Sequence, residues 1–452
     1  MAKNALIAAL SAVAITATLA ACGGGSTGSG TTNANPTNCT NAIVHKDAPA
    51  VSVWAWYPNM AKVVDNFNNS HTDVQVCWTV AGQGAPEYAK LQTAVSAGKG
   101  APDVVMLEAD QLTGFEIQKA LVDLSTFGAN DVKKNFSDGA WKDVSQGSAV
   151  YAIPIDGGPM AMIYRKDVFD KYGITTPPAT WAEYAADAQK VKDAGGPVFG
   201  DLGSNVPAAT TALMTQKGAV PFTYDLADGK NITIKIDSQA TKDVLNYWAD
   251  LSKKGLVGKE DQFTTDYISG VIGGKYATYI SAAWAPGYLT GAGVGVGDEK
   301  GKFAVAPLPQ WDAANPVSVN WGGSALAVTT QAVDAKLAAV VAIGLYADDA
   351  SLTDGWKTQT IFPLNQGVLT SDAFVNNKVD FFNGQTANKD IYIPAENNYK
   401  GFNYSPFSVY YYAQLQAEIV KINAGTTTGE QAATDLQKTI VTYATGQGFT
   451  VK

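Results

Sequence analysis

The chain has 452 residues, of which 46% are hydrophobic and 16% charged, enough for two or three domains with sizeable cores. Its formal net charge of −9 argues against nucleic acid as a partner. The single arginine, Arg165, excludes clusters of guanidinium groups around phosphate or carboxylate ligands. The only two histidines, His45 and His71, leave little for histidine acid–base chemistry or a zinc site.

The N-terminus has the pattern of a bacterial export signal. Lys3 supplies the positive charge, and residues 5–21 form an apolar stretch without a charge, so we expect residues 1–21 to be a signal peptide. Leu19-Ala20-Ala21-Cys22 resembles a lipobox, which predicts that Cys22 becomes the lipidated first residue of the mature chain. The alternative is an ordinary secretory signal with an incidental cysteine. Residues 22–48 are expected to hold this cysteine and a flexible Gly- and Ser-rich tether, which keeps the protein at the extracellular face of the cell membrane.

Two further cysteines remain in a chain that is exported to an oxidising compartment. Because their number is even, we predict a disulfide between Cys39 and Cys77, with two free thiols as the alternative. No Cys-x-x-Cys motif is present, so a redox site is not indicated.

The first part of the folded body alternates strands and helices. Apolar spacing predicts strands over 51–56, 74–80 and 102–107, with helices over 60–67, 86–95 and 112–115. This order is typical of βαβ units, so we expect an α/β fold with a parallel sheet.

The later part alternates less regularly. We expect strands over 150–155 and 160–164 around a turn at 156–159, further strands over 232–236, 303–306 and 325–328, and helices over 335–347, 410–423 and 430–443. Thr180-Trp181-Ala182-Glu183 is a capping box that opens another helix.

Three patterns in the chain could indicate catalysis, but each has a simpler explanation. Ser96-Ala97-Gly98-Lys99 matches a Ser-x-x-Lys motif without its partner motifs, and a helix end explains it better. The glycine-rich run 291–297 fits neither a dinucleotide loop nor a Walker loop and is interpreted as a surface loop. Glu108, Asp110 and Asp156 could include a glycosidase pair, but acids after strands more often cap helices or bind sugar hydroxyls.

Aromatic and polar residues near predicted strand ends indicate a carbohydrate-binding cleft. Sugar rings stack their C–H faces on aromatic rings, while their hydroxyls pair with carboxylates and amides. In open parallel sheets, ligands bind beyond the carboxyl ends of the strands. The candidate ligand-binding residues are Trp54, Trp56, Asn59, Glu108, Asp110, Asp156, Trp284, Trp321 and Gly322. Trp78 and Trp248 lie in regular apolar patterns and are assigned to the core.

Several motifs, in this order along the chain, resemble the carbohydrate-class extracellular solute-binding proteins of ABC importers, relatives of maltose-binding protein. The matching segments are 102–105, 120–124, 151–154, 163–169, 172–174, 177–184, 274–279 with Trp284, 306–309 and 321–324. Two positions depart from the family pattern: Arg165 stands where Asn is usual, and Thr278 stands where Met is common. Because of these departures, the ligand of any one family member is not assigned to this chain.

The resemblance implies a two-lobed periplasmic-binding-protein fold, with a hinge and a ligand cleft between the lobes. We expect lobe 1 to comprise 49–153 plus 311–360 and lobe 2 to comprise 154–310 plus 361–452. The chain would cross between the lobes near Pro154, near 306–310 and near Phe362-Pro363. The implied protein is a monomer that delivers a sugar to ABC permease subunits, with no catalytic residue, metal or cofactor.

An oligosaccharide is preferred over a monosaccharide because the chain is rich in aromatic residues. The main alternative is an extracellular glycoside hydrolase lipoprotein, which shares the signal, the acidity and the aromatic cleft. A metal-uptake lipoprotein would need more histidines or clustered carboxylates, and a receptor for an anionic ligand would need more than one arginine.

Overall fold

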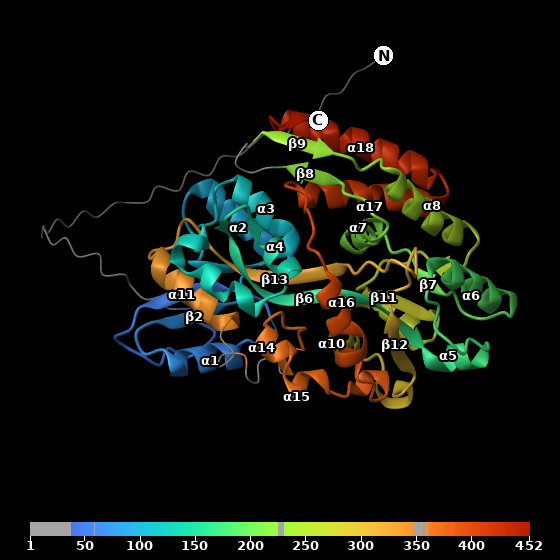
Figure 1. The fold of residues 1–452 in the computed structure, drawn as a ribbon, viewed down its shortest axis with the longest axis horizontal. Coiled ribbons are helices and arrows are strands. Elements are labelled where there is room, and N and C mark those ends of the chain that lie inside the picture. Colours follow the sequence, from blue (N-terminus) through green and yellow to red (C-terminus); the bar gives the residue numbers. More distant parts are fainter. Residues whose placement is uncertain (1–37, 58, 225–229, 348–351, 353–355, 358–359) are drawn as a thin grey trace, which may run out of the picture. The chain divides into compact units, whose positions relative to one another are not determined.

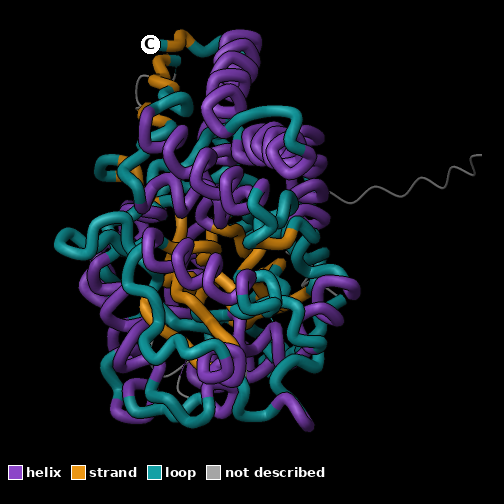
Figure 2. The backbone as a smooth tube through the Cα atoms, turned by 90° about the vertical axis from the view of Figure 1, so that its right-hand side faces the viewer, coloured by secondary structure: helices purple, strands orange, loops and turns teal. Residues whose placement is uncertain are grey.

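The computed structural model describes residues 38–57, 59–224, 230–347, 352, 356–357 and 360–452 (Figure 1). The predicted signal peptide, Cys22 and the first part of the tether lie outside the described residues. The described residues all belong to one compact unit, 35–452. In Figure 2 most of the strands lie in the interior with helices around them, while a few short strands lie at the edge beside the C-terminus.

A seven-stranded sheet in the order β11-β6-β13-β3-β1-β2, with β12 also paired to β6, forms the centre. β1 (Ala50–Trp54) pairs in parallel with both β2 (Gln75–Thr79) and β3 (Val104–Glu108). The helices α1 (Ala61–Ser70) and α2 (Ala85–Ala97) connect these strands, and α3 (Ala109–Ile117) follows them. The predicted βαβ units and their parallel strand pairing are therefore confirmed for this part of the sheet.

One long strand, β6 (Ala152–Arg165), runs through the middle of the sheet. Its first half pairs with β13 (Asn320–Val328), and its second half pairs with β11 (Thr278–Ala282) and β12 (Phe303–Pro307), all antiparallel. The prediction of two strands around a turn at 156–159 is wrong. Asp156, Gly157 and Pro159 all pair with β13, which a turn would prevent.

The helices predicted over 335–347, 410–423 and 430–443 in the C-terminal third are confirmed, and further helices lie between β3 and that region. The helices are α4 (Asp138–Asp143), α5 (Lys166–Lys171), α6 (Trp181–Asp193), α7 (Pro207–Gln216), α8 (Gln239–Lys253), α9 (Thr265–Ile272), α10 (Ala285–Gly291), α11 (Ala335–Tyr346), α14 (Gln366–Leu369), α15 (Asp372–Val375), α16 (Ile393–Asn398), α17 (Ser408–Ala424) and α18 (Gly429–Gly446). The capping box is present: Thr180 accepts from the Glu183 backbone, and the Glu183 side chain accepts from the Thr180 backbone.

Short strands, several 3₁₀ helices and one π-helix complete the described part of the fold. The strands are β4 (Ser145–Gln146), β5 (Ala149–Val150), β7 (Gly200–Asp201), β8 (Phe222–Tyr224), β9 (Asn231–Ile234), β10 (Val257–Gly258) and β14 (Thr450–Val451), and the short helices are η1 (Leu124–Phe127), η2 (Ala129–Asn135), η3 (Gly297–Glu299), η4 (Asp380–Phe382) and η5 (Asn388–Tyr392). The Ser-x-x-Lys pattern lies at the end of α2. The glycine-rich run 291–297 connects the end of α10 to the start of η3.

The buried side chains form three hydrophobic clusters. The largest covers one face of the sheet and contains Val53, Phe303 and Phe362. A second is built around α6, α8 and α17, and a third lies under α2 and α3. Trp78 and Trp248 are buried, so their assignment to the core is confirmed. Phe303 and Phe362 share a cluster with Val53, although the expected ranges place them in lobe 2, so the division of lobes by residue range stays a prediction.

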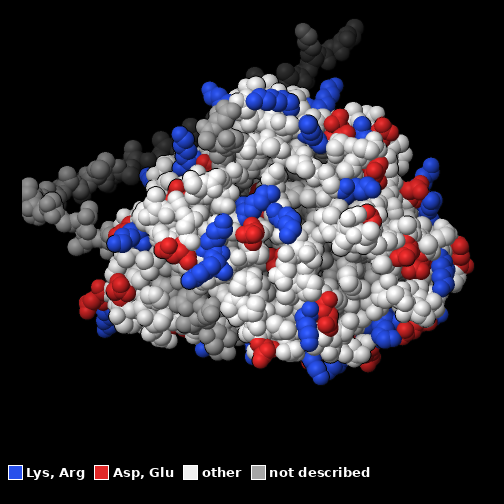
Figure 3. Space-filling view, in the orientation of Figure 1, with Lys and Arg blue, Asp and Glu red and all other residues white. Residues whose placement is uncertain are grey.

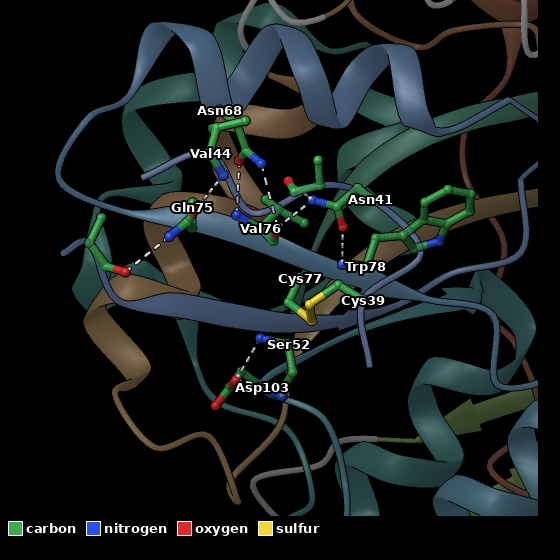
Figure 4. Close-up of a disulfide and its surroundings, with 12 residues drawn as sticks. Cys39, Asn41, Val44, Ser52, Asn68, Gln75, Val76, Cys77, Trp78 and Asp103 are labelled. Carbon is green, nitrogen blue, oxygen red and sulfur yellow. Dashed lines mark hydrogen bonds between the residues drawn. A yellow bond between two sulfur atoms is a disulfide. The ribbon is translucent and has the colours of Figure 1, made fainter. Parts of the chain in front are cut away.

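The predicted disulfide is present between Cys39 and Cys77, on a chain segment held along β2 (Figure 4). The Asn41 side chain donates to the Val76 carbonyl (2.8 Å) and accepts from the Trp78 backbone N–H (2.7 Å). The buried Gln75 side chain accepts from two backbone N–H groups, those of Val44 and His45. The anchored part of the chain therefore begins near Cys39, rather than at the expected start of lobe 1 at residue 49.

Removal of this disulfide should destabilise the protein. Cys39 and Cys77 are 38 positions apart, and closing such a loop restricts the unfolded chain by about 4 kcal/mol in the loop-entropy model. We expect the Cys39→Ala/Cys77→Ala variant to have a lower free energy of unfolding in urea. Wild type measured with and without a reductant is the control. Equal stability of the variant and of wild type without reductant would contradict a stabilising role for the bond.

Candidate functional site

The candidate site is a cavity of about 830 Å³ whose walls come from segments far apart in the sequence. This volume lies within the range of roughly 300–1,000 Å³ that ligand pockets occupy. Of the predicted site residues, seven line the cavity: Trp56, Glu108, Asp110, Asp156, Trp284, Trp321 and Gly322. The structure thus gathers in one place most of the residues that the sequence suggested.

Two predicted residues do not line this cavity. Trp54 is the last residue of β1 and packs, half-buried, against the third cluster. Asn59 is exposed in the loop before α1 and has a left-handed backbone, with φ of 54°. Of the residues between these two, Trp56 and Tyr57 line the cavity.

Three carboxylates line the cavity, and each is held by a donor from the protein. Glu108, at the end of β3, accepts from the Tyr88 hydroxyl (2.7 Å). Asp156, in β6, accepts from the Ser324 backbone N–H (3.0 Å) and from the Tyr57 hydroxyl. Asp110, in the first turn of α3, accepts from the neighbouring Gln111 side chain (2.8 Å). No Lys, Arg or His is among the described residues that line the cavity, so its charge is wholly negative.

Burial raises the pKa of all three acids. Desolvation, followed by repulsion from Asp110, raises the pKa of Glu108 to about 7. Desolvation raises the pKa of Asp156 to about 6, although hydrogen bonds from Tyr57 and Ser324 oppose the rise. The pKa of Asp110 is raised for the same reason, burial. Near neutral pH the cavity can therefore both accept hydrogen bonds and, through a protonated acid, donate them.

Aromatic rings form a second wall of the cavity. Trp284, which precedes α10, and Trp321, in β13, lie with ring centroids 5.0 Å apart at 76°. The Trp284 indole N–H donates to the Trp321 carbonyl (2.9 Å), which fixes its ring. Tyr288, one turn further along α10, and Phe263 complete this wall. Such a surface offers flat apolar faces together with nearby hydrogen-bonding groups.

The sequence reasoning missed several lining residues. Tyr57, Tyr88, Phe263, Tyr288 and Tyr412 all face the cavity. Tyr288 lies four residues after Trp284, a helical spacing that could have suggested it. For Phe263 and Tyr412 no local signal exists, because loop direction and helix packing alone place them there.

Two features are absent from the described residues. In that part of the chain no group of three His, Cys, Asp or Glu side chains could hold a metal ion. None of the described helices is long and apolar enough to cross a membrane.

The family model of the bacterial extracellular solute-binding proteins matches residues 55–348. The chain belongs to this family. It is 23% identical to the arabinooligosaccharide-binding protein of Bacillus subtilis over 334 residues, which are 72% of this chain and 75% of that protein. The family consists of solute-binding proteins, so membership favours a binding function over the glycoside hydrolase alternative.

Solved structures share the fold of this chain over most of its length. A binding protein associated with an ABC transporter of B. animalis subsp. lactis, in complex with β-1,6-galactobiose, is 27% identical with a TM-score of 0.74, over 90% of this chain and 100% of that one. The galacto-N-biose/lacto-N-biose I-binding protein of Bifidobacterium longum, 22% identical over 90% of this chain and 99% of that one, has a TM-score of 0.79. The fold of this family member is thus the two-lobed periplasmic-binding-protein fold predicted from the sequence.

The raised pKa of Glu108 should make stability fall between about pH 4.5 and 7. In this range the folded state keeps a proton that the unfolded state, with an ordinary Glu pKa near 4.3, has released. Ionisation in the folded state is thus opposed, and the free energy of unfolding declines as the pH rises. Glu108→Gln removes this titration while its side-chain oxygen can still accept from Tyr88, so its decline should be shallower than that of wild type.

The measurement is urea unfolding at several pH values from 4.5 to 7.5. Part of the slope should persist in Glu108→Gln, because burial also raises the pKa of Asp143 and Glu396 to about 7. Asp47→Asn, which changes an exposed carboxylate, is the control and should keep the wild-type slope. Identical slopes for Glu108→Gln and wild type would contradict a raised pKa of Glu108 in the folded state.

Proposed function

We propose that this solute-binding protein captures a neutral oligosaccharide in the cavity between its two lobes and delivers it to the permease subunits of an ABC importer. The observation that carries the proposal is the pairing of the Trp284–Trp321 aromatic wall with three carboxylates in one cavity of about 830 Å³. Aromatic faces suit the apolar sides of sugar rings, and carboxylates suit their hydroxyls.

The lining supports capture by closure. Tyr57 belongs to the first hydrophobic cluster, whereas Val206 belongs to the second and Tyr412 packs against the second. A ligand in the cavity therefore touches parts of the chain that are held in different cores. Only a ligand with more contacts in the closed state can shift the equilibrium towards it, and contacts from both sides meet that condition.

Charge and volume narrow the class of ligand. An anionic sugar, such as a uronate or a sulfated sugar, would meet three acids and no cation among the described lining residues. The volume favours more than one sugar ring, in keeping with the oligosaccharides in the names of the Bacillus and Bifidobacterium relatives. We therefore propose a neutral di- or oligosaccharide, without a choice of linkage.

The proposal includes a lipid anchor at Cys22 on the extracellular face of the cell membrane. Its support is the lipobox pattern followed by a Gly- and Ser-rich segment. On the face drawn in Figure 3, positive and negative side chains are interspersed, without a large patch of one sign. The lipid at Cys22 is therefore the expected attachment to the membrane. In keeping with the family resemblance, the protein is expected to act as a monomer.

Binding without turnover is the outcome that tests the function. The mature body, residues 39–452, is heated with neutral and anionic oligosaccharides, including arabino-oligosaccharides and β-1,6-galactobiose. At 100 times its dissociation constant a ligand should stabilise the protein by about 2.7 kcal/mol, visible as a thermal shift. Sugar that is bound and recovered intact supports a receptor. Cleavage would support the glycoside hydrolase instead, and no shift with any sugar would contradict the proposal.

Two tryptophans that the sequence could not tell apart provide matched variants. Trp284→Ala removes part of the aromatic wall and should weaken binding of the sugar found in that screen about tenfold or more. Trp54→Ala removes a ring outside the cavity, so it should lower stability while titration calorimetry finds the affinity unchanged. Equal losses of affinity would contradict the assignment of Trp284 to the site.

The anchor has a test of its own. Full-length protein expressed in a bacterium with lipoprotein processing should partition with the membrane and enter the detergent phase. Cys22→Ala should release it, because the thiol that carries the lipid is absent. Membrane retention of the Cys22→Ala protein would show that something other than a lipid at this residue attaches it.

A further inference from the structure

Phe263 has a backbone conformation that is unusual for its side chain. Its φ of 63° lies in the left-handed region, where the Cβ atom of an L-residue meets the neighbouring carbonyl oxygen. A bulky aromatic residue is rare there, and such strain persists only where the surroundings impose it.

Hydrogen bonds on both sides impose this conformation. On the N-terminal side, Asn205 donates to the Gln262 carbonyl (2.7 Å) and accepts from the Gln262 backbone N–H (2.9 Å). Gln262 is buried, and its side chain donates to Asp201 (2.8 Å). On the C-terminal side, Thr264 caps α9 by accepting from the Tyr267 backbone N–H (3.2 Å), and the Tyr267 hydroxyl donates to the same Asp201 (2.8 Å). The residue between these two fixed segments has little freedom.

The ring of Phe263 is directed to the cavity rather than to a core. It is 45% exposed and lines the cavity. Its neighbours are the other rings of the aromatic wall: Tyr288 at 5.1 Å, Trp321 at 6.0 Å and Trp284 at 6.1 Å between centroids. Burial of a large apolar side chain therefore does not account for the strained backbone, since the ring is only half-buried.

We propose that Phe263 is a specificity-determining residue of the cavity, whose strained backbone is held by Asn205 so that the ring adds a further stacking face to the aromatic wall. This inference rests on the proposed function and adds to it a residue that exchanges stability for binding. Asn205 acts as a positioning residue through the Gln262 backbone. The ligand class is one with an apolar ring face that reaches past Trp284, as the terminal ring of an oligosaccharide would.

The proposal predicts opposite effects on stability and on affinity. Phe263→Gly relieves the left-handed strain and removes the ring, so the melting temperature should be unchanged or higher, while affinity should fall about tenfold. Phe263→Ala removes the ring but keeps the strain, so it should bind as weakly and melt lower than Phe263→Gly. Phe263→Tyr keeps an aromatic face and should restore binding to within about threefold of wild type.

Lys119→Gly is the matched control for the glycine effect. Lys119 also has a left-handed backbone, with φ of 55°, but lies outside the residues that line the cavity. It should gain stability in the same way as Phe263→Gly and bind sugar as wild type does. The probe is the sugar that shifts wild type most in the screen, with β-1,6-galactobiose measured beside it.

A double-mutant cycle tests the role of Asn205. If Asn205 acts through Phe263, Asn205→Ala should weaken binding in wild type and have little further effect in Phe263→Gly. Additive losses would show that Asn205 contacts the sugar on its own account and would overturn its positioning role.

The failures of the two proposals can be told apart. If wild type binds no sugar, the proposed function fails and this inference fails with it. If wild type binds but Phe263→Gly binds equally well, only the inference is overturned. A Phe263→Gly protein that melts below Phe263→Ala would show that no strain is relieved, and would overturn the inference as well.

Discussion

The close approach of β6 and β13 at Gly158 is the constraint on which the site depends. Between the pairs Asn320–Pro159 and Gly323–Gly157, two residues of β13 stand opposite one residue of β6, which is a β-bulge. A Cβ atom on residue 158 would lie 1.9 Å from the Trp321 carbonyl oxygen, so only glycine allows the two backbones to meet. That same carbonyl accepts the Trp284 indole N–H, and the aromatic wall is thus built on the bulge.

The acids depend on the same pair of strands. Asp156 is two residues before Gly158, and it accepts from the Ser324 backbone N–H directly beyond the bulge. A buried carboxylate costs free energy unless it is hydrogen-bonded, and here the hydrogen bonds come from groups that the sheet fixes in place. The cavity therefore combines two costly features, buried acids and the strained Phe263, on a rigid support. Polar groups held ready in this way lose little freedom when a ligand arrives.

Features of the fold and the site that depend on nearby residues could be predicted from the sequence, whereas those that depend on contacts between distant segments could not. The parallel sheet, the capping box at Thr180 and the disulfide follow from local spacing and from the number of cysteines. The turn expected at 156–159 was wrong because Gly-Gly-Pro signals a turn locally, whereas its partner strand lies more than 160 residues further along the chain. Trp54 was grouped with Trp56 for their shared position at a strand end. Both pack against the third cluster, and only the tertiary structure shows that Trp56 lines the cavity whereas Trp54 does not. Phe263 could not have been foreseen, because its direction comes from hydrogen bonds to Asn205 and Asp201.

The bulge also lies where separate segments of the chain meet. The Gly157 backbone N–H donates to the Phe362 carbonyl (2.9 Å), and the Leu364 N–H donates to the Ile155 carbonyl (3.0 Å). Two of the predicted crossing positions, near Pro154 and near Phe362-Pro363, are thus hydrogen-bonded to each other beside Asp156. The Gln310 N–H, at the third, donates to the Ala179 carbonyl (2.9 Å), which ties it to the segment before α6. If Asp156 binds the ligand, as proposed, the ligand would act directly on β6, to which the segment at Phe362–Leu364 is hydrogen-bonded. In the proposed closure, the residue that contacts the ligand would itself belong to the strand that connects the two parts of the chain, so no relay through other side chains would be needed.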